Sequence, residues 1–181
     1  CTVVSIADSF SADEVRSRLT IGRATAVFTV MSAQRGDKQI PVYPRVVEAD
    51  GPMAIIVERA GATVAQSSQL LRDIDIAWPQ LLSDDASDIV VNGPPDTAMN
   101  ILFSSGTTGT PKAIIWDHST PIKAAADGLF HQDIHAGEVI AWPTNLGWMM
   151  GPWLIYATLI NRGTIALYDG APGEIAFGRF V

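Results

Sequence analysis

The sequence predicts an α/β fold in which layers of parallel sheet are flanked by helices. Hydrophobic residues make up 48% and charged residues 17% of the 181 positions, which is ample apolar material for a core. Short β-branched runs alternate with helical patterns along the chain, as is typical of parallel sheets. No internal repeat or low-complexity tract interrupts this alternation.

The first thirty residues have the pattern of a strand–helix–strand unit. Residues 2–6 and residues 24–30 are β-branched or apolar runs that predict strands. Between them, Ser11 and Glu14 have the spacing of a capping box, so a helix is expected to begin at Ser11 and to end at Gly22. We therefore expect the two strands to share one parallel sheet.

Residues 31–97 give weaker signals. The tetrapeptide Arg-Gly-Asp-Lys at 35–38 predicts a polar turn, and residues 59–75 show no clear periodicity. The other expected elements are a short helix after Pro44, a strand over 53–58 and a brief helix over 76–82. Asn92-Gly93-Pro94-Pro95 marks a break in the chain.

The last eighty residues again alternate between the two kinds of element. Strands are expected over 99–103, 113–116, 139–142 and 164–168. Thr120 and Pro121 are a typical N-cap and first-turn pair, which predicts a helix from Thr120 to about residue 131. A second, apolar helix is expected over 148–161, and a turn over 169–173.

Charge and cysteine content narrow the functional classes. The net charge of −7 argues against a general nucleic-acid binder and against a protein that binds anionic membranes. Cys1 is the only cysteine, so no internal disulfide is possible, which fits an intracellular, reducing compartment.

No apolar run reaches the roughly 18–20 residues of a membrane span. Because the chain starts at a cysteine and shows no signal peptide or polar tail, we expect it to be an excerpt of a longer protein.

Residues 103–112 have the composition of an anion-binding loop. Residues 103–112 (Phe-Ser-Ser-Gly-Thr-Thr-Gly-Thr-Pro-Lys) contain two glycines, five hydroxyl side chains and one lysine. Glycines let backbone N–H groups approach an anion closely, hydroxyls add donors, and the lysine adds a mobile positive charge. The segment therefore predicts a polyphosphate site. The alternative is a surface turn without a ligand, but such a turn does not need ten residues of this kind.

The spacing excludes the loop of P-loop nucleotidases. That motif places its lysine directly after a glycine, at the start of a helix. Here Pro111 precedes Lys112, and a β-branched, strand-like run follows. We therefore expect a hairpin-type loop between two strands.

Residues 104–112 closely resemble the phosphate-binding signature of the adenylate-forming (AMP-binding) superfamily, which includes acyl-CoA synthetases, luciferases and peptide-synthetase adenylation domains. Residues 142–151 resemble the region after that loop in acetyl-CoA-synthetase-like members. Residues 5–11 and 101–172 look most like the peroxisomal acyl-activating enzymes of plants. The resemblance implies that residues 1–181 are part of the large N-terminal adenylation domain, truncated at both ends and without the C-terminal lid domain.

The activity implied by the resemblance is that of an ATP-dependent acid–thiol ligase. A carboxylate attacks the α-phosphate of ATP to give an acyl-adenylate, and coenzyme A then displaces AMP to form a thioester. Lys112 and Thr107 are the implied catalytic residues, with Mg²⁺ bridging phosphate oxygens. The implied nucleotide-binding residues are Ser104, Ser105, Gly106, Thr107, Thr108, Gly109, Thr110 and Lys112. The resemblance also implies a role in fatty acid metabolism and a peroxisomal location.

The resemblance over residues 142–151 also implies a substrate pocket. Asn145, Trp148 and Met149 are candidates for the wall of the acyl pocket, whereas Trp142 is expected to pack in the core. Acetyl-CoA synthetases usually have an aspartate where Asn145 stands and a histidine near Pro152, which argues against acetyl specificity. His118, His131 and His135 lack a metal-binding spacing, so no residue is assigned to a metal.

Two alternatives stay open. The first is that the chain is a non-catalytic nucleotide-binding or interaction module from a truncated paralogue. In either an enzyme or such a paralogue, the excerpt alone is expected to be inactive, because several motifs of the superfamily lie downstream of residue 181 in relatives. The chain could also be an unrelated α/β domain in which the loop is accidental.

Overall fold

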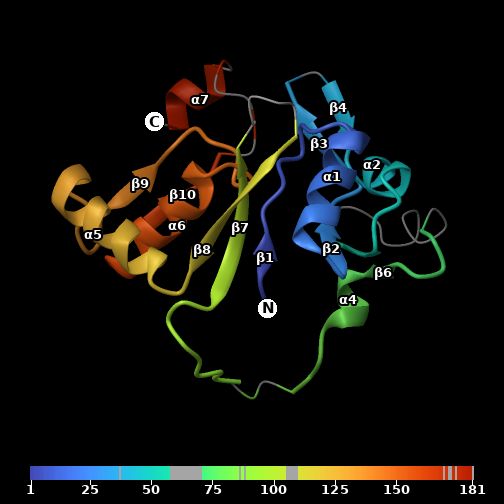
Figure 1. Cartoon of the computed structure of the whole chain (residues 1–181). Coiled ribbons are helices and arrows are strands. Elements are labelled where there is room, and N and C mark those ends of the chain that lie inside the picture. The colour runs from blue at the N-terminus through green and yellow to red at the C-terminus, as the bar shows by residue number, and fades with distance from the viewer. Residues whose placement is uncertain are drawn as a thin grey trace. The chain divides into compact units, whose positions relative to one another are not determined.

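The computed structural model describes residues 1–36, 38–57, 71–85, 87, 89–104, 110–168, 170, 173 and 175–180. The fold is mixed α/β, with parallel strand pairs and flanking helices, which confirms the predicted class (Figure 1). The chain divides into two compact units. The first consists of Cys1–Ala7 and Gly93–Val181, and the second of Asp8–Asn92.

The first unit holds a three-stranded sheet in the order β1-β7-β8. Strand β1 (Val3–Val4) runs parallel to β7 (Ala98–Ser104), and β7 runs antiparallel to β8 (Lys112–Asp117). Side chains reinforce the pairing of β1 with β7, because Ser5 Oγ donates to Asn100 Oδ1 at 3.0 Å. Asn100 and Leu102 on β7 are both buried, so the strand is anchored along its length.

A second group of elements completes this unit. Helix α5 (Thr120–Gln132) precedes strand β9 (Val139–Ala141), and α6 (Met150–Ile160) precedes β10 (Thr164–Ala166), which pairs parallel to β9. The two helices contact each other closely at Gly128, where an added Cβ would lie 2.9 Å from the Cβ of Ala157. A short helix, α7 (Ile175–Phe180), comes last.

The second unit is built on a parallel sheet in the order β2-β5-β6. Its strands are β2 (Ala26–Thr29), β5 (Met53–Ile56) and β6 (Ile76–Ala77), and its helices are α1 (Ala12–Gly22), α2 (Tyr43–Glu48) and α4 (Trp78–Leu81). A two-stranded hairpin of β3 (Ser32–Arg35) and β4 (Lys38–Pro41) lies between β2 and α2 in the chain. Tyr43, Val46, Ala54 and Ile56 form a buried core cluster.

The start of α1 is confirmed in detail. The backbone N–H of Glu14 donates to Ser11 Oγ, and the N–H of Ser11 donates to Glu14 Oε2, which is the reciprocal pattern of a capping box. The helix ends at Gly22 as expected, and the residue in the left-handed conformation is the C-cap Arg23, with φ of 49°.

Three expectations about these elements are wrong. The strands at the two ends of α1 do not share a sheet, because β1 pairs with β7 and β2 pairs with β5. The helix expected over 76–82 is a short strand followed by α4. The N-cap of α5 is Ser119 rather than Thr120, since Asp117 Oδ1 accepts from the N–H groups of both residues.

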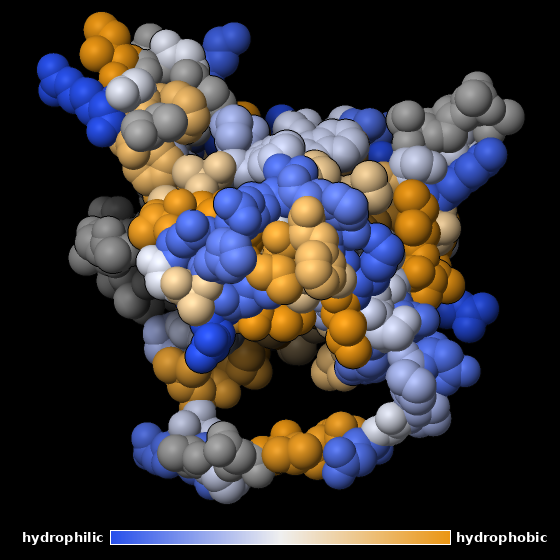
Figure 2. All heavy atoms as spheres, turned by 90° about the vertical axis from the view of Figure 1, so that its left-hand side faces the viewer, coloured by the Kyte–Doolittle hydropathy of each residue, from blue (hydrophilic) through white to orange (hydrophobic). Residues whose placement is uncertain are grey.

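The polar turn expected over 35–38 is the connection of the β3–β4 hairpin, where Gly36 has a φ of 58°. Asp37 lies outside the described residues, as do 58–70 and most of the turn expected over 169–173. Within the described chain, no helix is long and apolar enough to cross a bilayer. Figure 2 shows a face on which hydrophobic and hydrophilic side chains are interspersed. On α5, Ile122 and Phe130 are exposed, and so are their sequence neighbours Lys123 and His131.

Candidate functional site

The β7–β8 hairpin positions both ends of the glycine- and hydroxyl-rich segment. Ser104 pairs with Lys112, and Phe103 pairs with Ala113, across antiparallel strands. The expected hairpin geometry is therefore confirmed. Because the last ladder pair is Ser104 and Lys112, the two residues that flank the segment are held side by side.

The middle of this segment lies outside the described residues. It comprises Ser105, Gly106, Thr107, Thr108 and Gly109. The phosphate-binding roles predicted for these five residues, and the catalytic role of Thr107, stay predictions.

The described flanks are suited to an anion. Ser104 is half-buried, while Thr110 and Lys112 are exposed. Among the residues that the structure describes, Lys112 has no ion-pair partner, whereas the exposed Lys123 pairs with Asp127 on the same helix. The Lys112 ammonium is thus available to an anion that enters the loop.

Asp117, at the far end of β8, stabilises the turn into α5. The hydroxyls of Ser119 and Thr120 donate to Asp117 Oδ1 at 2.7 and 3.0 Å, and these bonds lower the pKa of this carboxyl. The hairpin is thereby fastened to α5 at its open end, away from the glycine- and hydroxyl-rich segment.

The candidate pocket residues lie together on one turn that precedes α6. Asn145 Oδ1 accepts from the N–H of Gly147 at 2.8 Å, and the carbonyl of Asn145 accepts from the N–H of Trp148 at 3.0 Å. The carbonyl of Trp148 in turn accepts from the N–H of Gly151 at 2.9 Å. Consecutive hydrogen bonds therefore define the backbone from Asn145 to Gly151.

Two glycines in this turn are required by close backbone contacts. A Cβ on Gly147 would lie 2.4 Å from the nitrogen and 2.5 Å from the Cα of Ala7. A Cβ on Gly151 would lie 2.4 Å from the Cα of Leu146. The sequence interpretation did not single out these glycines, although their four-residue spacing next to Asn145 was a signal that could have indicated a tight turn.

The large side chains of this region are only partly buried. Trp148 is 43% and Met149 is 52% exposed, so both can form the wall of an open pocket. Trp142 is also 43% exposed and packs edge-on against Trp153, with ring centroids 6.0 Å apart. The core role expected for Trp142 is therefore wrong, because one side of its ring stays open to solvent.

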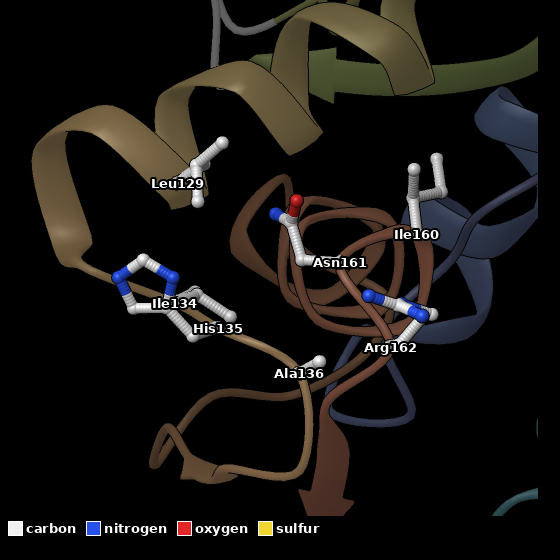
Figure 3. A pocket seen from close by; sticks show the side chains of 7 residues that line it. All are labelled: Leu129, Ile134, His135, Ala136, Ile160, Asn161 and Arg162. Atoms are coloured by element: carbon white, nitrogen blue, oxygen red, sulfur yellow. The ribbon is translucent and has the colours of Figure 1, made fainter.

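A separate pocket of about 420 Å³ lies where α5 and α6 end (Figure 3). It is lined by Leu129, Ile134, His135, Ala136, Ile160, Asn161 and Arg162. Helix C-termini carry partial negative charge, and the neighbouring carboxylates Asp133 and Glu138 both bond His135. This pocket is consequently a poor site for a polyphosphate, despite the presence of Arg162.

Two of the histidines, His131 and His135, each lie near one carboxylate. His135 Nε2 lies 2.9 Å from Asp133 Oδ1, and His131 Nε2 lies 3.9 Å from Asp127 Oδ1. In the described ranges, no group of three or more His, Cys, Asp or Glu side chains could hold a metal ion.

The chain is similar to several known proteins. Hexanoyl-CoA synthase of Cannabis sativa is 53% identical over 184 residues, which cover 99% of this chain and 25% of that protein. The probable acyl-activating enzyme 17, peroxisomal, of Arabidopsis thaliana is 48% identical, with the same coverage. The structure of acetoacetyl-CoA synthetase from Streptomyces lividans matches with a TM-score of 0.77 and 29% identity, over 92% of this chain and 25% of that one.

The chain thus spans about a quarter of the length of each of these relatives. The family model described as AMP-binding enzyme matches residues 1–178, which is nearly the whole chain. The chain belongs to the AMP-binding enzyme family.

Proposed function

We propose that the chain is part of an ATP-dependent acyl-CoA synthetase. The observation that carries the proposal is the β7–β8 hairpin, which holds Ser104 opposite an exposed Lys112 at the two ends of the glycine- and hydroxyl-rich segment. In a member of the AMP-binding enzyme family, this arrangement suits the phosphates of ATP.

The proposed reaction has two steps. A carboxylate oxygen attacks the α-phosphorus of ATP, and pyrophosphate leaves as the acyl-adenylate forms. The thiol of coenzyme A then attacks the acyl carbon, and AMP leaves as the thioester forms. The first step places growing negative charge on pyrophosphate, which N–H and hydroxyl donors of residues 104–110 and the Lys112 ammonium would stabilise.

Mg²⁺ would neutralise part of the phosphate charge. In proteins this ion is usually bound by one or two carboxylates together with substrate phosphates. The described residues offer no cluster of carboxylates for it. We assign no residue of this chain to the ion.

The proposed acid substrate carries an apolar group larger than acetyl. The exposed indole of Trp148 and thioether of Met149 offer it an apolar wall. A relative that is 53% identical is named for hexanoyl-CoA, which supports a substrate of this class. The names of the Arabidopsis relatives support a peroxisomal location.

We further propose that these residues form one part of a larger adenylation domain, because they cover 25% of their relatives. The 181-residue chain by itself should then show no turnover. ATP–pyrophosphate exchange by the isolated chain would contradict this.

The test of the function uses the full-length protein. ATP–pyrophosphate exchange and thioester formation are measured with a panel of straight-chain and aryl carboxylic acids. Lys112→Ala should lower kcat/KM for ATP by about 10- to 100-fold, the cost of losing a charged hydrogen bond. The matched control Lys123→Ala, another exposed lysine, should stay within about twofold.

Two results would contradict the proposal. Exchange with none of the acids would exclude the ligase activity; ATP binding without exchange would instead favour a non-catalytic nucleotide-binding module. Equal effects of Lys112→Ala and Lys123→Ala would remove Lys112 from the ATP site.

A further inference from the structure

We propose that Asn145 is a positioning residue, which holds the turn that presents Trp148 and Met149 to the acyl group and does not itself contact the substrate. The proposal rests on the proposed function and changes the role of Asn145 within it. The side chain that family resemblance assigns to the pocket wall is engaged by the backbone of its own turn.

The first argument is the hydrogen bonding of Asn145. Its side-chain oxygen accepts from the N–H of Gly147 at 2.8 Å, and its carbonyl oxygen accepts from the N–H of Trp148 at 3.0 Å. A single residue thereby fixes two successive peptide units. Asn and Asp commonly form such a bond to the residue two positions later, which stabilises a turn locally.

The second argument is the surface on which the turn lies. Gly147 packs directly on the backbone of Ile6 and Ala7, where an added Cβ would lie 2.4–2.6 Å from three backbone atoms. Gly151 packs with similar closeness on the backbone of Leu146. A side chain at either position would collide with backbone atoms, so this turn requires glycine at both.

These contacts determine which side chains are exposed. With its glycines against neighbouring backbone, the turn leaves Trp148 and Met149 43% and 52% exposed. Small displacements of such groups in a substrate site weaken binding, because the contacts depend on geometry. Loss of the Asn145 side-chain hydrogen bond should therefore raise KM for the acid and leave KM for ATP nearly unchanged.

The chemistry of residue 145 separates positioning from contact. An aspartate supplies the same acceptor oxygen as Asn145, whereas alanine supplies none. If the amide of Asn145 touched an apolar acyl group, an aspartate would place a negative charge in the pocket and would weaken binding at least as much as alanine. If Asn145 acts through the bond that it accepts from Gly147, Asn145→Asp keeps this bond and should restore what Asn145→Ala loses.

The experiment measures KM for a medium-chain carboxylic acid, KM for ATP and kcat in the full-length protein. Asn145→Ala should raise KM for the acid by about three- to tenfold, the effect of one lost hydrogen bond, with the other two constants within about twofold. Asn145→Asp should stay within about twofold of the wild type on all three constants. Hydrogen exchange of a peptide that contains Gly147 should accelerate in Asn145→Ala only.

A second pair of variants tests the surface under the turn. Gly147→Ala must displace the backbone of Ala7 and should raise KM for the acid at least as much as Asn145→Ala. Gly178→Ala is the matched control, because an added Cβ there meets nothing within 4 Å.

The outcomes separate the two proposals. An Asn145→Asp variant as impaired as Asn145→Ala would show that residue 145 contacts the substrate. Equal losses for acid, ATP and kcat would show a role in folding alone. Either result overturns the positioning role while the ligase stands. A wild-type protein without activity toward any acid would overturn the proposed function, and faster exchange at Gly147 in Asn145→Ala would then still identify the turn as held by Asn145.

Discussion

The guanidinium of Arg72 contacts the carboxylate of Asp75 through two of its nitrogens. Nε lies 2.8 Å from Oδ2, and Nη2 lies 2.9 Å from Oδ1. The hydroxyl of Tyr43 donates to Oδ2 at 2.7 Å, and the N–H of Ala54 donates to Oδ1 at 2.7 Å. A buried carboxylate thus joins α2, β5 and the residues before β6.

This network makes the second unit sensitive to acid. Burial by itself raises the pKa of Asp75, but the bonds from Arg72, Ala54 and Tyr43 outweigh it and lower the pKa from 3.8 to about 2. The unfolded chain therefore binds a proton at higher pH than the folded one. The stabilisation is complete above about pH 4 and is lost as the pH falls toward 2, by about 2 kcal/mol.

Urea unfolding between pH 5 and 2, followed by hydrogen exchange of peptides that cover β5, measures this loss. Asp75→Asn should be less stable at pH 5, and its stability should fall less steeply over the same interval. Identical slopes for the two proteins would show that Asp75 does not titrate with folding.

Tyr43→Phe should destabilise the second unit by about 1–2 kcal/mol, because the buried carboxylate loses a donor. The N–H of Arg72, which donates to the Tyr43 hydroxyl at 3.0 Å, loses its acceptor as well. Tyr156→Phe is the matched control on α6, and urea unfolding compares the two. A Tyr43→Phe variant as stable as the control would contradict a structural role for this hydroxyl.

Thr158→Val should leave the first unit equally stable or more stable by up to about 1 kcal/mol. Thr158 is 0% exposed, and its hydroxyl has no hydrogen-bond partner among the described residues. Valine has the same shape and removes the buried polar group. Thr158→Ala, which also removes a methyl group, should be destabilising. Thermal unfolding compares the wild type with the two variants. A strongly destabilised Thr158→Val variant would show that the hydroxyl has a hydrogen-bond partner.

Ser11→Ala should cost about 1 kcal/mol, because α1 loses its N-terminal cap. Ser17→Ala is the control on the same helix, where the serine hydroxyl only donates to the carbonyl of Asp13. Hydrogen exchange of a peptide that covers the first turn of α1 should accelerate in the first variant and not in the second. Equal protection in both would contradict the capping box.

The sequence was sufficient to predict a structural feature where the residues that form it are close together in the chain. The capping box of α1 depends on Ser11 and Glu14, which are three positions apart. The β7–β8 hairpin was predictable because strand-like runs that contain β-branched residues flank the loop on both sides. The turn at Asn145 contains its own signal, two closely spaced glycines, but only the structure shows that Ala7 is the reason for one of them.

The features that could not be predicted from the sequence involve residues far apart in the chain or strands made of polar residues. Asp75 meets Tyr43 and Ala54, which lie 32 and 21 positions away, so no local pattern reveals the network. The pairing of β1 with β7 rather than β2 is also a choice among distant strands. The β3–β4 hairpin was missed because its strands, such as Ser32–Arg35, lack an alternating apolar face.

The discontinuity of the first unit has a consequence for synthesis. The hydroxyl of Thr2 donates to the carbonyl of Ala98, which is 96 positions later. A ribosome that adds about 5–20 residues per second needs roughly 5–20 seconds to make that stretch. During this time residues 8–92, whose described contacts are largely their own, can complete their unit. Strand β1 therefore leaves the ribosome before residues 8–92 but meets its partner strand β7 only after they have been made.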